Sequence, residues 1–149
     1  MITLRHAVQE DAELLAQWFN ERTNSVYMED TRESYDAEYL KDKLGAMDFI
    51  ILLDEKPMGY CSLYDIDTKD GRAEISLLVG DKAKQGKGYG KEALRLLCDS
   101  AFNELGLKEL FARVDEDNIP SLRILDRCGF YRAGKKGRDI IFVKKNYSL

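Results

Sequence analysis

The sequence predicts a single α/β domain in which a mixed, mostly antiparallel sheet is flanked by helices. The chain has 149 residues, which is the size of one domain. Apolar runs joined by short polar turns fill residues 49–79, and this pattern predicts a meander of antiparallel strands. Residues 73–114 then read as strand, glycine loop, helix and strand, an arrangement that makes two strands parallel.

Composition and charge argue against several classes of protein. The formal net charge is −4 and the pI is about 5.1, which disfavours a nucleic-acid platform and suits a small cationic partner. No apolar run approaches membrane-spanning length, and no signal peptide is recognisable, so the cytoplasm is the expected location. Cys61, Cys98 and Cys128 read as reduced, buried thiols, and His6 has no metal-ligand partners at suitable spacing.

Periodicity gives the elements of the first half. Alternation predicts an opening strand at residues 2–5, and helical spacing predicts a helix from Asp11 to about Glu21 that buries Trp18. A second helix is expected within residues 35–44. Strands are then expected at 49–53, 60–64 and 73–79, joined by the turns DEKPMG and DIDTKDG.

Carboxylates are dense within residues 29–42. They are Glu29, Asp30, Glu33, Asp36, Glu38 and Asp42, against only Arg32 and Lys41. Such a run is typical of a solvated helix face. The alternative is that these carboxylates, with nearby tyrosines, line a pocket for a positively charged amine.

The second half continues with clear end signals. A helix after the glycine loop ends at Gly106, and a strand follows at 107–114. Asn118 is a good N-cap for a short helix with Pro120 in its first turn, and this helix stops at Gly129. Residues 130–133 and 139–144 predict a closing hairpin.

The glycine loop, Gln85 to Lys91, has the chemistry of a phosphate site. Glycines spaced by two at the start of a helix let several backbone N–H groups converge, and Lys84, Lys87 and Lys91 add positive charge. Neither the Walker loop nor the dinucleotide fingerprint matches this spacing. A flexible loop with incidental lysines is the alternative interpretation.

The pattern Gln-x-x-Gly-x-Gly at Gln85, Gly88 and Gly90 resembles the coenzyme A pyrophosphate loop of the GCN5-related N-acetyltransferase (GNAT) superfamily. A second match is Asn118-x-x-Ser121 with Gly129-Phe130 at the helix end. The sequence looks most like the branch of ribosomal-protein N-terminal and spermidine acetyltransferases. The resemblance implies a sheet of about seven strands flanked by about four helices and splayed between strands 4 and 5.

The resemblance also implies acetyl-CoA as co-substrate, with no metal. The pantetheine arm would lie in the splay and the pyrophosphate on the glycine loop. The residues expected to bind the coenzyme are Leu77, Leu78, Val79, Gln85, Gly86, Lys87, Gly88, Tyr89, Gly90, Lys91, Asn118 and Ser121.

Catalytic roles follow from the same resemblance and from the needs of acyl transfer. Glu74 is expected to be the general base or a ligand of the substrate amine, and an outward-facing strand carboxylate is the alternative. The backbone N–H of Leu78 is the expected oxyanion donor. The usual tyrosine acid aligns with Leu125, which cannot donate a proton, so Ser121 is the expected substitute. A plain helix-surface serine is the alternative for Ser121, and Tyr89 and Tyr131 are further candidate acids.

The sequence thus predicts an N-acetyltransferase that moves an acetyl group from acetyl-CoA to a primary amine by direct attack. The preferred acceptor is a protein N-terminus or a polyamine, and an amino-sugar or aminoglycoside comes second. A non-catalytic acyl-CoA sensor and a nucleotide-phosphate binder are the alternatives from other classes. The resemblance allows a homodimer, and neither a nucleic acid nor a membrane is an expected partner.

Overall fold

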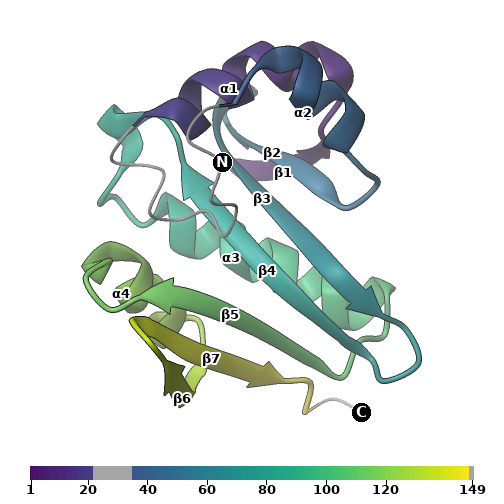
Figure 1. Cartoon of the computed structure of the whole chain (residues 1–149), viewed down its shortest axis with the longest axis vertical. Helices are drawn as coiled ribbons and strands as arrows, with labels where there is room; N and C mark the ends of the chain where they lie inside the picture. The colour runs from purple at the N-terminus through teal and green to yellow at the C-terminus, as the bar shows by residue number, and fades with distance from the viewer. Residues whose placement is uncertain (22–34, 148–149) are drawn as a thin grey trace.

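The computed structural model describes residues 1–21 and 35–147, which form one mixed sheet with helices on both faces (Figure 1). The strand order is β1-β2-β3-β4-β5-β7-β6, and only the β4–β5 pair is parallel. The strands are β1 (Ile2–His6), β2 (Asp48–Leu53), β3 (Lys56–Asp67), β4 (Arg72–Val79), β5 (Glu109–Asp115), β6 (Tyr131–Lys136) and β7 (Asp139–Lys145).

Two apolar cores lie on opposite faces of the sheet. The helices α1 (Ala12–Asn20) and α2 (Ala37–Lys43) pack with Ile50, Tyr60 and Leu78 in the smaller core. The larger core joins the other face to α3 (Tyr89–Asp99) and α4 (Ile119–Arg127). Because strand side chains alternate, even-numbered residues of β4 face α1 and α2, and odd-numbered residues face α3 and α4.

The expected splay between strands 4 and 5 is present. Backbone pairing of β4 with β5 begins at Arg72↔Glu109 and ends at Glu74↔Phe111. Figure 1 shows that the two strands start together and end apart. The remaining edge of β4 is therefore left facing a gap beside the N-terminal ends of α3 and α4.

One expectation about the strands changes in detail. The segment DEKPMG, residues 54–59, is expected to be a turn, but the turn is confined to Asp54 and Glu55, whose φ angles are +49° and +71°. This tight hairpin lets β3 begin at Lys56, and the strand runs on to Asp67. In the closing hairpin, β7 lies between β5 and β6, so the last strand pairs with β5.

Other expectations hold in the described residues. Trp18 is 5% exposed, and the three cysteines are buried and unbridged. Burial raises the pKa of the Cys98 thiol to about 12, which makes it unreactive at neutral pH. No helix in ranges 1–21 and 35–147 is long and apolar enough to cross a membrane.

The acidic segment is only partly described. Asp36 caps α2 by accepting the N–H of Tyr39, and Glu38 pairs with Lys41 at 3.1 Å. These contacts match the solvated-face interpretation for this part of the segment. Glu29, Asp30 and Glu33 lie outside the described residues.

Candidate active site

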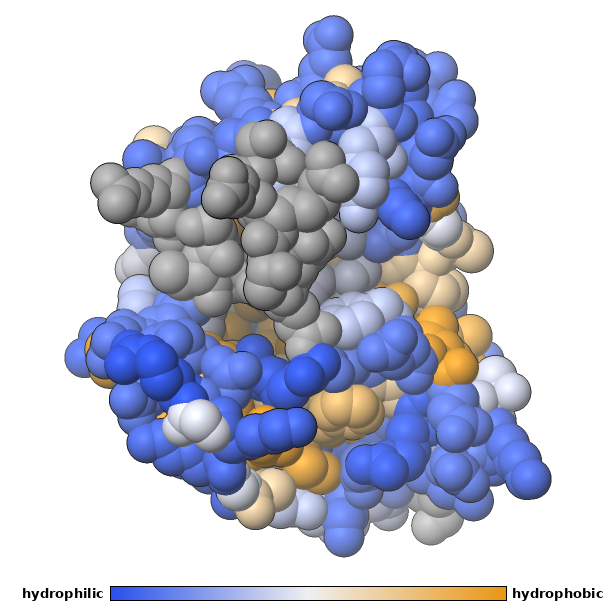
Figure 2. Space-filling view, viewed as in Figure 1, coloured by the Kyte–Doolittle hydropathy of each residue, from blue (hydrophilic) through white to orange (hydrophobic). Residues whose placement is uncertain are grey.

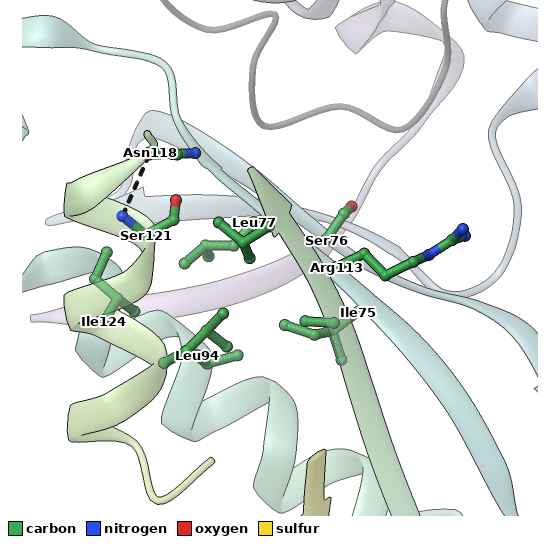
Figure 3. Close-up of a pocket in the computed structure, with 11 residues that line it drawn as sticks. Ile75, Ser76, Leu77, Leu94, Arg113, Asn118, Ser121 and Ile124 are labelled. Atoms are coloured by element: carbon green, nitrogen blue, oxygen red, sulfur yellow. Dashed lines mark hydrogen bonds between the residues drawn. The ribbon is translucent and has the colours of Figure 1, made fainter. Parts of the chain in front are cut away.

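The gap between β4 and β5 contains a small cleft of about 40 Å³ (Figure 3). Ile75, Ser76 and Leu77 of β4 line it from one side. Leu94 of α3, Ala112, Arg113 and Val114 of β5, and Asn118, Ser121, Ile124 and Leu125 of α4 complete the lining. Figure 3 shows Asn118 and Ser121 at the N-terminal end of α4, beside the opening between the strands.

A larger cavity of about 430 Å³ lies over the glycine loop and shares Leu77, Ser121 and Ile124 with the cleft. Its other lining residues are Val79, Lys84, Gln85, Gly86, Gly88, Gly90, Lys91, Pro120, Arg123 and Arg127. Gly86 and Gly88 have φ angles of +75° and +86°, and a Cβ at either would meet no neighbouring atom within 4 Å. The loop therefore presents its backbone to open space, as a phosphate cradle requires.

Arg123 and Arg127 line the same cavity and were not among the residues expected from the sequence. They lie four residues apart on α4, so both reach the same side of the helix, where Lys84 and Lys91 also line the cavity. The spacing of four within a helix already predicted from Asn118 was the signal that would have found them. Lys87, by contrast, is exposed, and neither Lys87 nor Tyr89 lines this cavity.

Asn118 combines a structural role with a vacant donor. Its Oδ1 accepts the backbone N–H of Ser121 at 3.4 Å, which caps α4 as predicted. Its Nδ2 is buried and has no hydrogen-bond partner among the described residues. An unmet buried donor is unfavourable, so a ligand oxygen or carbonyl in the cleft would stabilise it. This fits the expected contact with the pantetheine arm.

The direction of the β4 backbone corrects one expectation. The carbonyl of Gly71, just before β4, accepts the N–H of Glu109, and the carbonyl of Val79 accepts Gln85 Nε2 at 2.8 Å. Both carbonyls face the β5 side, so odd-numbered residues between them direct their N–H and C=O groups there. The N–H of Leu78 therefore faces β3. Leu77 and Val79 direct theirs into the gap, so Leu78 is not placed to be the oxyanion donor.

Glu74 is buried at the point where the two strands separate. Its side chain is 2% exposed, and it accepts two hydrogen bonds from Arg113, of 3.1 and 3.2 Å. The Tyr64 hydroxyl donates to its Oε2. Burial raises the pKa of Glu74, and donation from Tyr64 opposes that rise. The carboxylate is thus fixed by hydrogen bonds from Arg113 and Tyr64.

Tyr64 opens onto a third cavity, of about 640 Å³, on the α1/α2 side of the sheet. Asp48, Tyr60, Ser62, Asp65 and Ser76 also line it. The rest of its lining is Lys43, Gly45, Ala46, Met47, Leu63 and Ile66. Figure 2 shows apolar surface between the half of the molecule with α1 and α2 and the half with β5 and β7, bordered by hydrophilic side chains.

The three cavities are connected through the residues that they share. Leu77, Ser121 and Ile124 line both the cavity over the glycine loop and the cleft, and Ser76 lines both the cleft and the third cavity. An elongated phosphate ester lying along the first two would present its end near Ser76, where a molecule in the third cavity can meet it. Leu125, in place of the usual tyrosine, lines the cleft with Ser121. The arrangement suits a transfer between two substrates bound from different sides.

Comparisons with known proteins indicate an acetyltransferase. The family model "Acetyltransferase (GNAT) domain" matches residues 1–131. An uncharacterized N-acetyltransferase p20 of Bacillus licheniformis is 31% identical over 144 residues, covering 89% of this chain and 80% of the relative. An aminoglycoside N(6')-acetyltransferase type 1 of Klebsiella pneumoniae is 24% identical, covering 89% and 75%. The solved structure of a domain from Methanocaldococcus jannaschii is 26% identical, with a TM-score of 0.84 over 98% of this chain and 99% of that one.

Proposed function

The chain belongs to the GNAT acetyltransferase family, and on that premise we propose that it transfers the acetyl group of acetyl-CoA to a primary amine. The observation that supports this most is the series of three connected cavities, with Ser76 between the cleft and the third cavity. A sensor that only bound the coenzyme would not need the third cavity. From here we call the third cavity the acceptor cavity.

The proposed coenzyme site uses groups from three elements. The pyrophosphate would lie on the N–H groups of the glycine loop, close to Lys84, Lys91, Arg123 and Arg127. The pantetheine arm would lie in the cleft, where Asn118 Nδ2 is an available donor. Acetyl-CoA supplies the thioester carbonyl that the amine attacks.

We propose that Glu74 takes one proton of the ammonium through Tyr64, whose hydroxyl joins the acceptor cavity to the buried carboxylate. The nitrogen then forms a bond to the carbonyl carbon and releases a second proton to solvent, and the carbon–sulfur bond breaks. The N–H of Leu77 is the proposed oxyanion donor, because it faces the gap next to Ser76. The departing thiolate takes a proton from the Ser121 hydroxyl, which solvent replaces.

The acceptor is proposed to be a cationic amine. Among the described residues, Asp48 and Asp65 line the acceptor cavity together with one lysine, Lys43, so the cavity favours positive charge. A protein N-terminus or a polyamine remains the first proposal, and a relative named as a probable spermine N(1)-acetyltransferase, 35% identical over 72 residues, is in keeping with it. An aminoglycoside is the second, supported by the aminoglycoside acetyltransferase relatives.

The test is acetyl-CoA-dependent release of free thiol with spermidine, an alanyl tripeptide and kanamycin as acceptors. We expect turnover with at least one amine, and we expect Glu74→Gln to reduce kcat/KM by about 100-fold at neutral pH with partial recovery at high pH. If no amine reacts, calorimetry with CoA separates the alternatives. Binding without turnover of any amine would favour the sensor, and absence of binding would contradict the coenzyme site.

The homodimer that the resemblance allows is also a proposal. Sedimentation velocity would show it as a species of twice the chain mass of 17.1 kDa.

A further inference from the structure

Three polar side chains form a row across β2, β3 and β4 on the wall of the acceptor cavity. Asp48 lies directly opposite Ser62, and Ser62 lies directly opposite Ser76 in the strand register. The hydroxyl oxygens of Ser62 and Ser76 are 2.9 Å apart. All three residues line the acceptor cavity, so the row leads across its wall to Ser76.

Tyr60 and Gly45 hold Asp48, the residue at the outer end of this row. Its hydroxyl donates to Asp48 Oδ1 at 2.6 Å, and the N–H of Gly45 donates to Asp48 Oδ2 at 2.6 Å. Burial and the nearby Asp48 raise the pKa of Tyr60. The phenol therefore stays protonated and donates to Asp48.

The two serine hydroxyls share one hydrogen bond, in which either oxygen can be the donor. A hydroxyl has one donor and two acceptor lone pairs, so in both arrangements the Ser76 oxygen keeps at least one lone pair for another donor. Ser76 can therefore accept an N–H group from a molecule in the acceptor cavity.

Ser76 is also where the two substrates would meet. It lines both the acceptor cavity and the cleft, whereas Glu74, two residues earlier on the same face, is 2% exposed and covered by Arg113 and Tyr64. Figure 3 shows the Ser76 hydroxyl directed away from α4 and its cleft-lining side chains. A nitrogen held at this hydroxyl would lie beside the thioester end of the cleft.

We propose that the Ser76 hydroxyl, which is held by its hydrogen bond with Ser62, binds the nitrogen of the attacking amine by accepting one of its N–H groups. This rests on the proposed transferase function and adds the residue that positions the nucleophile. One of the other two protons of the ammonium leaves through Tyr64 to Glu74, and the lone pair that this exposes faces the carbonyl carbon. After the attack the nitrogen releases one more proton to solvent, and the amide keeps the third. Ser76 itself gains and loses no proton overall.

Ser76→Ala compared with Ser76→Thr tests this assignment, because threonine keeps the hydroxyl and suits a strand. With spermidine, the alanyl tripeptide or kanamycin, whichever the wild type acetylates fastest, we expect Ser76→Ala to lower the acceptor kcat/KM by about 10- to 100-fold. The KM for acetyl-CoA should stay within about twofold, and Ser76→Thr should recover most of the rate. Ser100→Ala, which removes a hydroxyl that donates to Glu104 in the π-helical segment Ser100–Glu104 after α3, is the matched control.

Ser62→Ala extends the test to the row. Because Ser62 acts through Ser76, the Ser62→Ala/Ser76→Ala double variant should be no slower than Ser76→Ala alone. An unchanged acceptor kcat/KM in Ser76→Ala, a loss that threonine does not restore, or an equal change in the acetyl-CoA KM would each overturn the proposal. A wild type that binds CoA yet acetylates none of the three amines would instead overturn the transferase function on which it rests.

Discussion

Glu74 and Arg113 are joined by two hydrogen bonds, of 3.1 and 3.2 Å, at the end of the paired segment of β4 and β5. The carboxylate is almost wholly buried, and the guanidinium is 38% exposed. A buried carboxylate without a cation would be expensive to ionise. The pair therefore favours the ionised form of Glu74, which its proposed role as a proton acceptor through Tyr64 requires.

The first prediction concerns this pair. Arg113→Met removes the cation, so the pKa of Glu74 should rise further, because its charged form loses support. The acid limb of log kcat/KM against pH should then move to higher pH, with reduced activity at pH 7 that recovers toward pH 9. Arg95→Met, an exposed arginine on α3, is the control. An acid limb at the wild-type position in Arg113→Met would contradict the role given to Glu74.

The second prediction separates strain from ligand binding. Gly88 and Gly106 have φ angles of +86° and +67°, and a Cβ at either would meet open space. Alanine at either position should therefore cost about 1 kcal/mol of unfolding free energy. Only Gly88→Ala should also weaken CoA binding, by about 10-fold or more, because it redirects the N–H groups of the cradle. Calorimetry and urea unfolding of both variants measure this, and equal CoA affinities would refute the cradle.

The third prediction concerns the cations of α4. Arg123→Gln and Arg127→Gln should each weaken CoA binding by about 10-fold, as loss of a charge-assisted hydrogen bond predicts. Affinity for pantetheine, which has no phosphates, should not change, and the salt dependence of CoA binding should decrease. Arg95→Gln serves as the control. If pantetheine and CoA weaken together, the arginines support the cleft and do not contact phosphate.

The fourth prediction concerns the start of α1. Asp11 accepts two 2.8 Å hydrogen bonds from Arg5 and another from the N–H of Val8, and its side chain is 9% exposed. The Arg5 guanidinium is the largest cause that lowers the pKa of Asp11. The ion pair of Arg5 and Asp11 thus stabilises the fold at pH values above the pKa that Asp11 has in the unfolded chain. This stabilisation is lost as the pH falls through the lower pKa that Asp11 has in the folded protein. Asp11→Asn should cost about 1–3 kcal/mol at pH 7 and much less below about pH 3.

Urea unfolding at both pH values checks this, with Asp99→Asn on α3 as a surface control expected within about 0.5 kcal/mol of wild type. A cost for Asp11→Asn that is the same at both pH values would show that the ion pair is not its source.

Several site features followed from the sequence because they are local. The glycine loop is defined by a few consecutive residues before α3, and Asn118 caps α4, the helix that begins at the next residue. The parallel β4–β5 pair followed from the strand–helix–strand order. The extent of β3 did not, because Pro57 and Gly59 read as turn residues and only sheet pairing shows that they continue the strand.

The sequence by itself determined the family, the order of elements and the coenzyme loop, because these depend on periodicity and on short motifs. Only the tertiary structure decided which side chains of different elements contact one another. It paired Glu74 with Arg113 from a different strand, and it placed Ser62 opposite Ser76. It also turned the N–H of Leu78 away from the gap. Such relations depend on strand register, where a shift of one residue reverses every side chain and every backbone hydrogen bond, and no local pattern in the sequence records that register.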